Sequence, residues 1–133
     1  MLHLVMHDLL SIAISRISVA VLSKKPYTIL PYSGLILSCM QKLLDLGYIT
    51  TFKVLSQSEI LVSLRFVDNR PSIRRILRIS KPGKRIFRRP KNMKRIFGNN
   101  IQGFWLLSTP RGILTDQECF FYNIGGELLF TVF

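Results

Sequence analysis

The stretch that decides the fold runs from Gly103 to Glu127 and reads GFWLLSTPRGILTDQECFFYNIGGE. Two apolar runs, Phe104–Leu107 and Ile113–Leu114, flank a polar turn, which predicts two strands joined by that turn. Small hydroxyls, an arginine and a glycine on a rigid apolar frame suit close approach of the backbone to a phosphate chain. The turn consists of Ser108, Thr109, Pro110, Arg111 and Gly112.

A short helix and a last strand are expected after this turn. Thr115 or Asp116 is expected to cap the helix, and Glu118 lies in its first turn, where the helix dipole favours an acid. The pair Gly125-Gly126 is expected to end the helix, and residues 127–133 to form the strand. Three aromatic residues crowd this helix, more than one small lobe requires: Phe120, Phe121 and Tyr122.

The first half of the chain predicts a separate lobe. Residues 6–22 carry apolar side chains on more than one helical face, which predicts a helix packed on more than one side. A strand over 27–30 follows, and then a helix that begins after Ser33 and ends at Gly47. Residues 48–55 and 60–67 are expected to pair as a hairpin.

The predicted fold class is therefore α+β in two small lobes. The N-terminal lobe has the order helix, strand, helix, hairpin, and the C-terminal lobe is strand-rich with one short helix. The turn-forming run Asp68-Asn69-Arg70-Pro71 marks the expected boundary. This division gives an N-terminal domain of residues 1–68 and a C-terminal domain of residues 69–133.

The positive charge of the chain comes from one block. From Arg70 to Arg95 there are twelve basic residues and no acidic one, while seven acids balance the other seven basic residues. The net charge of +12 therefore lies in this block. It indicates a polyanionic partner, most commonly nucleic acid, with anionic membrane as the rival. Inside the block, residues 81–84 predict a type II turn between paired arms over 73–80 and 84–89.

Several other chemistries find no support in the sequence. Cys39 and Cys119 have apolar neighbours and no CxxC spacing, so both are expected to be buried and reduced, in an intracellular or organelle-matrix setting. His3 and His7 lack further ligands for a metal, and Ser108 lacks a base for nucleophilic catalysis. No enzyme activity, metal or cofactor is expected.

Three motifs lie in the same order and at near-identical spacing in a known family. SKPGKRIF at Ser80–Phe87 resembles RxSRPGxRIY, LSTPRGILTD at Leu107–Asp116 resembles VxSTSxGxMTDxxA, and IGGE at Ile124–Glu127 carries GGE. The run Asp8–Ile17 is similar to DPIADMLTRI. The chain thus resembles small-subunit ribosomal protein eight of the bacterial type over essentially its whole length.

The resemblance implies a structural protein of the small ribosomal subunit that supports subunit assembly and translation. Its C-terminal lobe would bind the central domain of small-subunit ribosomal RNA, and its neighbours would include small-subunit proteins two, five and seventeen. Glu127 would hold the loop in place or meet a base edge. The implied RNA-binding set is Ser80, Lys81, Pro82, Gly83, Lys84, Arg85, Phe87, Ser108, Thr109, Pro110, Arg111, Gly112, Thr115, Gly125, Gly126 and Glu127.

Departures from the family pattern refine these expectations. Gly34 and Ile36 stand where the family has lysines, so the N-terminal lobe has lost basic contacts. Apolar residues at Phe120–Phe121 replace a polar or basic pair and suggest extra protein neighbours. Such drift favours an organellar ribosome: a mitochondrion first, then a plastid, with a bacterial cytoplasm as the other alternative. The lack of an Arg-rich leader fits a protein encoded inside the organelle.

The rival function is a basic peripheral protein on anionic membranes. It is less favoured because the cations are expected on a strand hairpin and not along an amphipathic helix.

Overall fold

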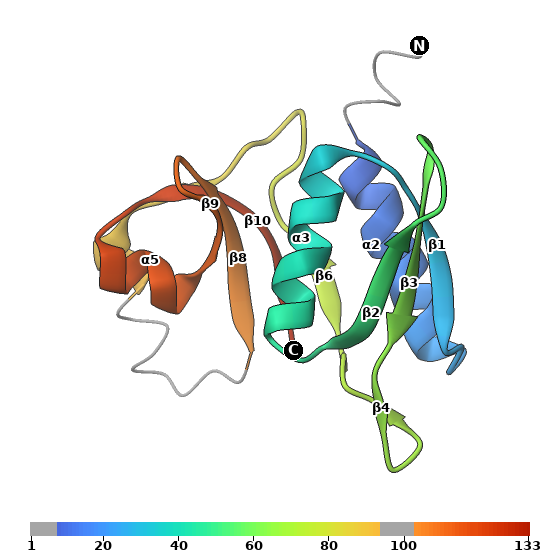
Figure 1. The fold of residues 1–133 in the computed structure, drawn as a ribbon. Coiled ribbons are helices and arrows are strands. Elements are labelled where there is room, and N and C mark those ends of the chain that lie inside the picture. Colours follow the sequence, from blue (N-terminus) through green and yellow to red (C-terminus); the bar gives the residue numbers. More distant parts are fainter. Residues whose placement is uncertain (1–7, 94–102) are drawn as a thin grey trace. The chain divides into compact units, whose positions relative to one another are not determined.

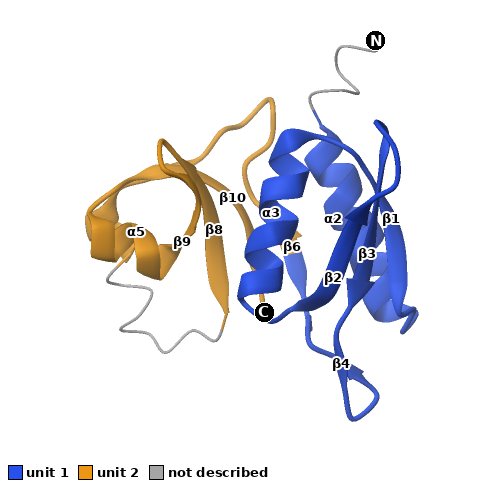
Figure 2. Ribbon diagram, viewed as in Figure 1, with its two compact units in different colours: residues 1–76 blue, residues 77–133 orange. Residues whose placement is uncertain are grey.

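The computed structural model describes residues 8–93 and 103–133. The chain divides into two compact units, Met1–Ile76 and Leu77–Phe133 (Figure 2). The units are helix and antiparallel sheet, which confirms the α+β class. The predicted limits of 1–68 and 69–133 stay a prediction.

Unit 1 packs two helices on a small sheet (Figure 1). The sheet has the order β1-β3-β2, with β1 at Tyr27–Pro31, β2 at Ile49–Val54 and β3 at Glu59–Leu64. Alternate residues of β3 are buried, so one face of this sheet is in the core. The helices are α2 (Leu9–Leu22) and α3 (Gly34–Asp45).

Local signals account for the ends of α3. The hydroxyl of Ser33 accepts a hydrogen bond from the backbone N–H of Ile36 at 3.1 Å, as the N-cap prediction requires. After the helix, Gly47 has φ +85°, a conformation that side chains rarely adopt. The buried residues of α2 follow helical spacing on one face, while Val19 and Leu22 are 58% and 83% exposed, so the prediction of a helix packed on more than one side was wrong. The buried residues are Leu10, Ala13, Ile14, Ile17, Ala20 and Val21.

Asp68 and Asn69 lie in a tight hairpin. Both have positive φ, 54° and 64°, and they connect β4 (Phe66–Val67) to β5 (Arg70–Pro71). Asp and Asn tolerate this left-handed backbone better than other residues with a side chain. The run that predicts the domain boundary therefore folds as a hairpin of unit 1, and the division between the units follows Ile76.

Unit 2 is built on a five-stranded sheet with the order β6-β10-β8-β9, in which β7 also pairs with β10. A core of Met93, Leu107, Leu114, Cys119 and Leu128 packs on it. Cys39 and Cys119 are both buried, as predicted. The elements are β6 (Ile76–Arg78), β7 (Phe87–Arg88), β8 (Phe104–Thr109), β9 (Gly112–Thr115), α5 (Asp116–Tyr122) and β10 (Gly126–Val132).

The predicted hairpin arms over 73–80 and 84–89 do not form a two-stranded ladder. The strands β6 and β7 each pair with β10, and the backbone bridge between the two segments is the isolated one at Lys81 and Lys84. Because long-range pairing with β10 competes with local pairing, the pattern alone could not identify the partner strand. Gly83 does not have the positive φ that a type II turn needs at this position, so that prediction was wrong.

The predicted end of α5 was also wrong. Asn123 terminates the helix in the left-handed conformation, with φ 57°, and Gly125 precedes β10. The predicted helical turn around residues 92–97 is described only as far as residue 93, where residues 90–93 are helical. Its remainder, with His3 and His7, lies outside the described residues.

The two glycines Gly83 and Gly126 make a matched pair for a stability test. A Cβ on Gly126 would collide with the Ser108 carbonyl oxygen and lie 2.9 Å from Thr109 Cγ2, whereas a Cβ on Gly83 would meet nothing within 4 Å. We expect Gly126→Ala to lower the free energy of unfolding by about 1–3 kcal/mol because the strands must separate. Gly83→Ala should leave it within about 0.5 kcal/mol. Urea unfolding measures both, and equal values would contradict this packing.

Candidate nucleic-acid interface

The first residues of β10 bring two distant segments together. Glu127 pairs with Phe87 of β7 on one side and with Ser108 of β8 on the other. Residues paired across antiparallel strands project to the same face, so these three side chains share one face of the sheet. The next pair, Leu107 and Leu128, belongs to the core on the opposite face.

Gly125 and Gly126 permit this convergence. A Cβ on Gly125 would lie 2.7 Å from the Arg88 carbonyl oxygen, and one on Gly126 would collide with the Ser108 carbonyl oxygen. The glycine pair thus passes between β7 and β8 at close range. In this structure the glycines pack against the protein's own backbone, and any contact of theirs with RNA stays a prediction.

Ser80 lies beneath the surface, fully buried. Its hydroxyl donates a hydrogen bond to Glu127 Oε2 at 2.6 Å and accepts one from the backbone N–H of Ile86 at 3.0 Å. The segments that contain Ser80 and Ile86 both bond to the backbone of Leu128. The Leu128 carbonyl accepts a hydrogen bond from the Ser80 N–H, and the Leu128 N–H donates one to the Ile86 carbonyl. Ser80 and Ile86 therefore form the neck of a loop, residues 81–85.

This segment, which we call the cationic loop, presents its charges to solvent. All five residues are exposed, and Lys81 and Lys84 exchange backbone hydrogen bonds of 3.0 and 2.9 Å. The neck at Ser80 and Ile86 and the bonds between Lys81 and Lys84 close the loop. The loop consists of Lys81, Pro82, Gly83, Lys84 and Arg85.

The turn between β8 and β9 is held by a hydroxyl. Thr109 Oγ1 donates to the Gly112 carbonyl oxygen at 2.8 Å and accepts from the backbone N–H of Arg111 at 3.1 Å. Gly112 has φ +104°, which favours glycine. Pro110, Arg111 and Gly112 are exposed, so the turn presents backbone and a guanidinium to solvent.

Thr115 is buried and serves the helix. Its hydroxyl accepts from the Glu118 N–H at 3.2 Å, and Glu118 Oε1 accepts from the Thr115 N–H at 3.0 Å, which completes a capping box. This confirms the cap and assigns the hydroxyl to the helix, although Thr115 also stands in the implied RNA-binding set.

The carboxylates of unit 2 all make internal contacts. Asp116 is 2% exposed and accepts from the Trp105 N–H at 3.3 Å, Glu118 is in the capping box, and Glu127 accepts from Ser80. Unit 2 contains no other acid. Against these three acids, the described residues of unit 2 expose six cations: Lys81, Lys84, Arg85, Arg89, Lys91 and Arg111.

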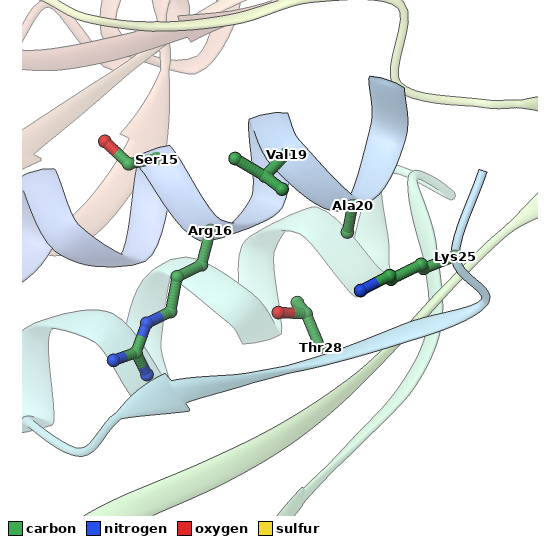
Figure 3. Close-up of a pocket in the computed structure, with 6 residues that line it drawn as sticks. All are labelled: Ser15, Arg16, Val19, Ala20, Lys25 and Thr28. Atoms are coloured by element: carbon green, nitrogen blue, oxygen red, sulfur yellow. The ribbon is translucent and has the colours of Figure 1, made fainter. Parts of the chain in front are cut away.

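Two hollows lie in unit 1. One, of about 220 Å³, is flanked by Arg16 and Lys25, whose side chain reaches toward Ala20 and Thr28 (Figure 3). The Arg16 guanidinium donates to the Ile29 carbonyl at 2.9 Å. The other hollow has cations on its lining, Arg70 and Arg74. Across residues 8–93 and 103–133, no three His, Cys, Asp or Glu side chains gather as a metal site would need.

Comparison with known proteins decides the family. The model of the family "Ribosomal protein S8" matches residues 8–133. The chain belongs to the ribosomal protein S8 family. It is 40% identical over 131 residues to "Small ribosomal subunit protein uS8" of Bradyrhizobium sp., which covers 96% of this chain and 98% of that protein. It is 36% identical over 125 residues to "Small ribosomal subunit protein uS8m" of Acanthamoeba castellanii, at 94% and 98% coverage.

S8-family membership confirms the resemblance and the prediction that this chain is not an enzyme, because the family consists of structural ribosomal proteins. Among the predicted residues, the structure places Phe87, Gly126, Glu127 and Ser108 side by side. It places Ser80 and Thr115 inside the protein. Sequence reasoning missed Ile86 at the neck. Its role there is that of its backbone N–H, which the type of side chain does not indicate.

Removal of the Ser80 hydroxyl tests the neck. Ser80→Ala leaves the Ile86 N–H and the Glu127 carboxylate without this buried partner, and we expect a loss of about 2 kcal/mol in the free energy of unfolding. Ser38→Ala, at an exposed position of α3, is the matched control and should change it by less than about 0.5 kcal/mol. Urea denaturation measures both free energies of unfolding. A loss of stability for Ser80→Ala no larger than that for the control would contradict the role of the Ser80 hydroxyl in closing the loop.

Asp116 gives a pH test. Burial raises the pKa of its carboxyl above the ordinary 3.8, although N–H groups such as that of Trp105 oppose the shift. The folded state then binds the proton more tightly than the unfolded state does. The stability that this carboxyl contributes is therefore fully present below pH 3.8 and is lost as the pH rises through the pKa of the folded state. Asp116→Asn, which keeps an acceptor oxygen, should therefore gain stability relative to the parent from about pH 4 to 7. Unfolding at several pH values measures this difference, and a relative loss would show that the backbone bonds outweigh burial.

Proposed function

We propose that this chain is a structural constituent of the small ribosomal subunit, where it binds the central domain of small-subunit ribosomal RNA and supports subunit assembly and translation. The names of its relatives support its assignment to the small ribosomal subunit. One observation supports the RNA contact most strongly. The start of β10 holds the cationic loop and the Thr109 turn on its two sides, through Ser80 and Ser108.

The two segments suit different parts of the RNA. Cations on a loop held at its neck contact phosphates and release counterions, which supplies affinity without base readout. The compact turn lets backbone approach closely, because Gly112 has no side chain. We propose direct contacts by ten members of the implied set: Lys81, Pro82, Gly83, Lys84, Arg85, Phe87, Ser108, Pro110, Arg111 and Gly112.

Six members of that set act from within the protein in this proposal. The hydroxyls of Ser80 and Thr109 close the loop and the turn, and Thr115 caps α5. Glu127 orients Ser80, and Gly125 and Gly126 allow the segments to converge. For Glu127 this favours the first of its two implied roles, holding the loop in place.

The cellular setting belongs to the proposal as well. The similarity to a relative named uS8m supports a mitochondrial ribosome, while the bacterial relatives keep the other settings open. Neighbouring small-subunit proteins two, five and seventeen are proposed partners by family resemblance.

Binding to an anionic membrane surface is the second candidate, supported by the same exposed cations. Among the residues that the structure describes, no helix is long and apolar enough to cross a bilayer. Flotation with vesicles that contain phosphatidylserine, beside a central-domain RNA transcript at equal salt, compares the two. Stronger binding to the vesicles would overturn the RNA proposal.

Replacement of Lys81, Lys84 and Arg85 by Gln tests the cationic loop. Each lost phosphate contact should reduce the steepness of the plot of log Kobs against log salt by about one unit. The slope of the triple variant should therefore be shallower by up to about three units. Filter binding to a central-domain transcript of Bradyrhizobium small-subunit RNA gives the slopes. Lys24→Gln with Lys42→Gln and Lys53→Gln, three lysines of unit 1, is the control. Equal slopes for the two triple variants would remove the loop from the interface.

The Thr109 hydroxyl has its own test. Thr109→Val keeps the branched shape but loses the two hydrogen bonds of the turn, and RNA affinity should fall by about 1–2 kcal/mol. Thr109→Ser keeps the hydroxyl and should retain most of the affinity. A Thr109→Val variant that binds the same transcript as the parent does would show that the held turn is not needed.

A further inference from the structure

The aromatic residues of α5 remain on the surface of unit 2. Phe121 is 80% exposed, Tyr122 is 46% exposed and Phe120 is 41% exposed, while the buried side of this helix is formed by Asp116 and Cys119. Because these rings are exposed, the neighbours expected for them must belong to another molecule. Figure 1 shows α5 as a short helix beside the β8–β9 strands.

A cation lies against these rings. The guanidinium carbon of Arg111 is 4.8 Å from the centroid of the Tyr122 ring, and Phe121 meets Tyr122 edge-on, with centroids 5.2 Å apart and planes at 85°. The Thr109 hydroxyl holds Arg111 through its backbone N–H. The end of α5 is thus joined to the turn that we propose as an RNA contact. We call Arg111, Phe121 and Tyr122 the aromatic patch.

Charge indicates what kind of partner covers the aromatic patch. The described residues of unit 2 expose six cations, Arg111 among them, while Asp116 is buried under α5 and Glu118 bonds the Thr115 N–H in the capping box. The occupant should therefore bring a negative charge together with a flat apolar group. A single nucleotide has both, in its phosphate and its base. A protein neighbour would need an acidic and an apolar side chain placed side by side.

We propose that the aromatic patch stacks an unpaired base of the ribosomal RNA, beside the RNA segment that meets the Thr109 turn. This proposal rests on the proposed function. Phe121 supplies the stacking surface, and Arg111 supplies charge to the adjoining phosphate. The base must be unpaired or bulged, because bases stacked within a helix are not open to a side chain.

Substitutions at Phe121 test the stacking. In filter binding to the Bradyrhizobium central-domain transcript, Phe121→Ala and Phe121→Leu should each lower the affinity about tenfold, and Phe121→Trp should retain it. The salt slope should not change, because stacking releases no counterions. Leu22→Ala is the matched control, since this side chain is 83% exposed on a helix of unit 1. Because Phe121 is also exposed, its variants are expected to fold.

The outcomes separate this inference from the proposed function. If the parent binds RNA with a steep slope but Phe121→Ala binds equally well, the aromatic patch is not an RNA contact. A Phe121→Leu variant that keeps the parent affinity would overturn stacking, because Leu keeps apolar area without a π face. A variant that binds RNA normally but fails to enter reconstituted subunits would assign the patch to a protein. A parent slope near zero would defeat the proposed function itself.

Photo-crosslinking gives a direct measurement. Ultraviolet irradiation of the complex, followed by peptide mapping, should join the transcript to the peptide that contains Phe121 and Tyr122. Phe121→Ala should reduce this crosslink while a crosslink at the cationic loop persists. Crosslinks at the loop alone in the parent complex would contradict the stacking.

Discussion

The hydroxyl of Ser80 is the interaction on which the surface of unit 2 depends. It is fully buried, and it donates a hydrogen bond to Glu127 and accepts one from the Ile86 N–H. Both partners need it, because a buried carboxylate oxygen or N–H left without a hydrogen bond is costly. One side chain thus closes the cationic loop and ties it to β10. A loop closed in this way loses less conformational entropy on binding than a free basic segment does.

The second constraint is the close approach of the β10 backbone to β7 and β8, which brings the cationic loop and the Thr109 turn to the same strand. Gly125 and Gly126 let β10 pass between Arg88 and Ser108 where a Cβ would collide with their carbonyl oxygens. The Thr109 turn then projects beside Glu127, on the other side of β10 from the loop. Small residues and buried hydroxyls, with no charge of their own at the surface, determine where the charged residues lie.

The electrostatics follow from how the acids are used. The three acids of unit 2, Asp116, Glu118 and Glu127, bond backbone groups and Ser80, whereas six of its described cations are exposed to solvent. We propose that this surface makes three kinds of contact: the cationic loop with phosphates, the Thr109 turn by close backbone approach, and the aromatic patch with a base. The first two involve residues of motifs that resemble the family pattern, whereas Phe121 of the aromatic patch departs from it.

The sequence by itself determined both ends of α3, the start of α5 and the position of the basic block along the chain. Ser33, Gly47 and Thr115 mark helix ends through contacts only a few residues away, and the basic block is visible as composition. Only the tertiary structure decided that the arms around the cationic loop pair with β10, that Ser80 is buried, and that glycines expected to end a helix serve strand packing. The physical reason is range: a cap depends on its own turn of chain, whereas strand partners and close packing depend on segments brought together from more than forty residues apart, as Ser80 and Glu127 are.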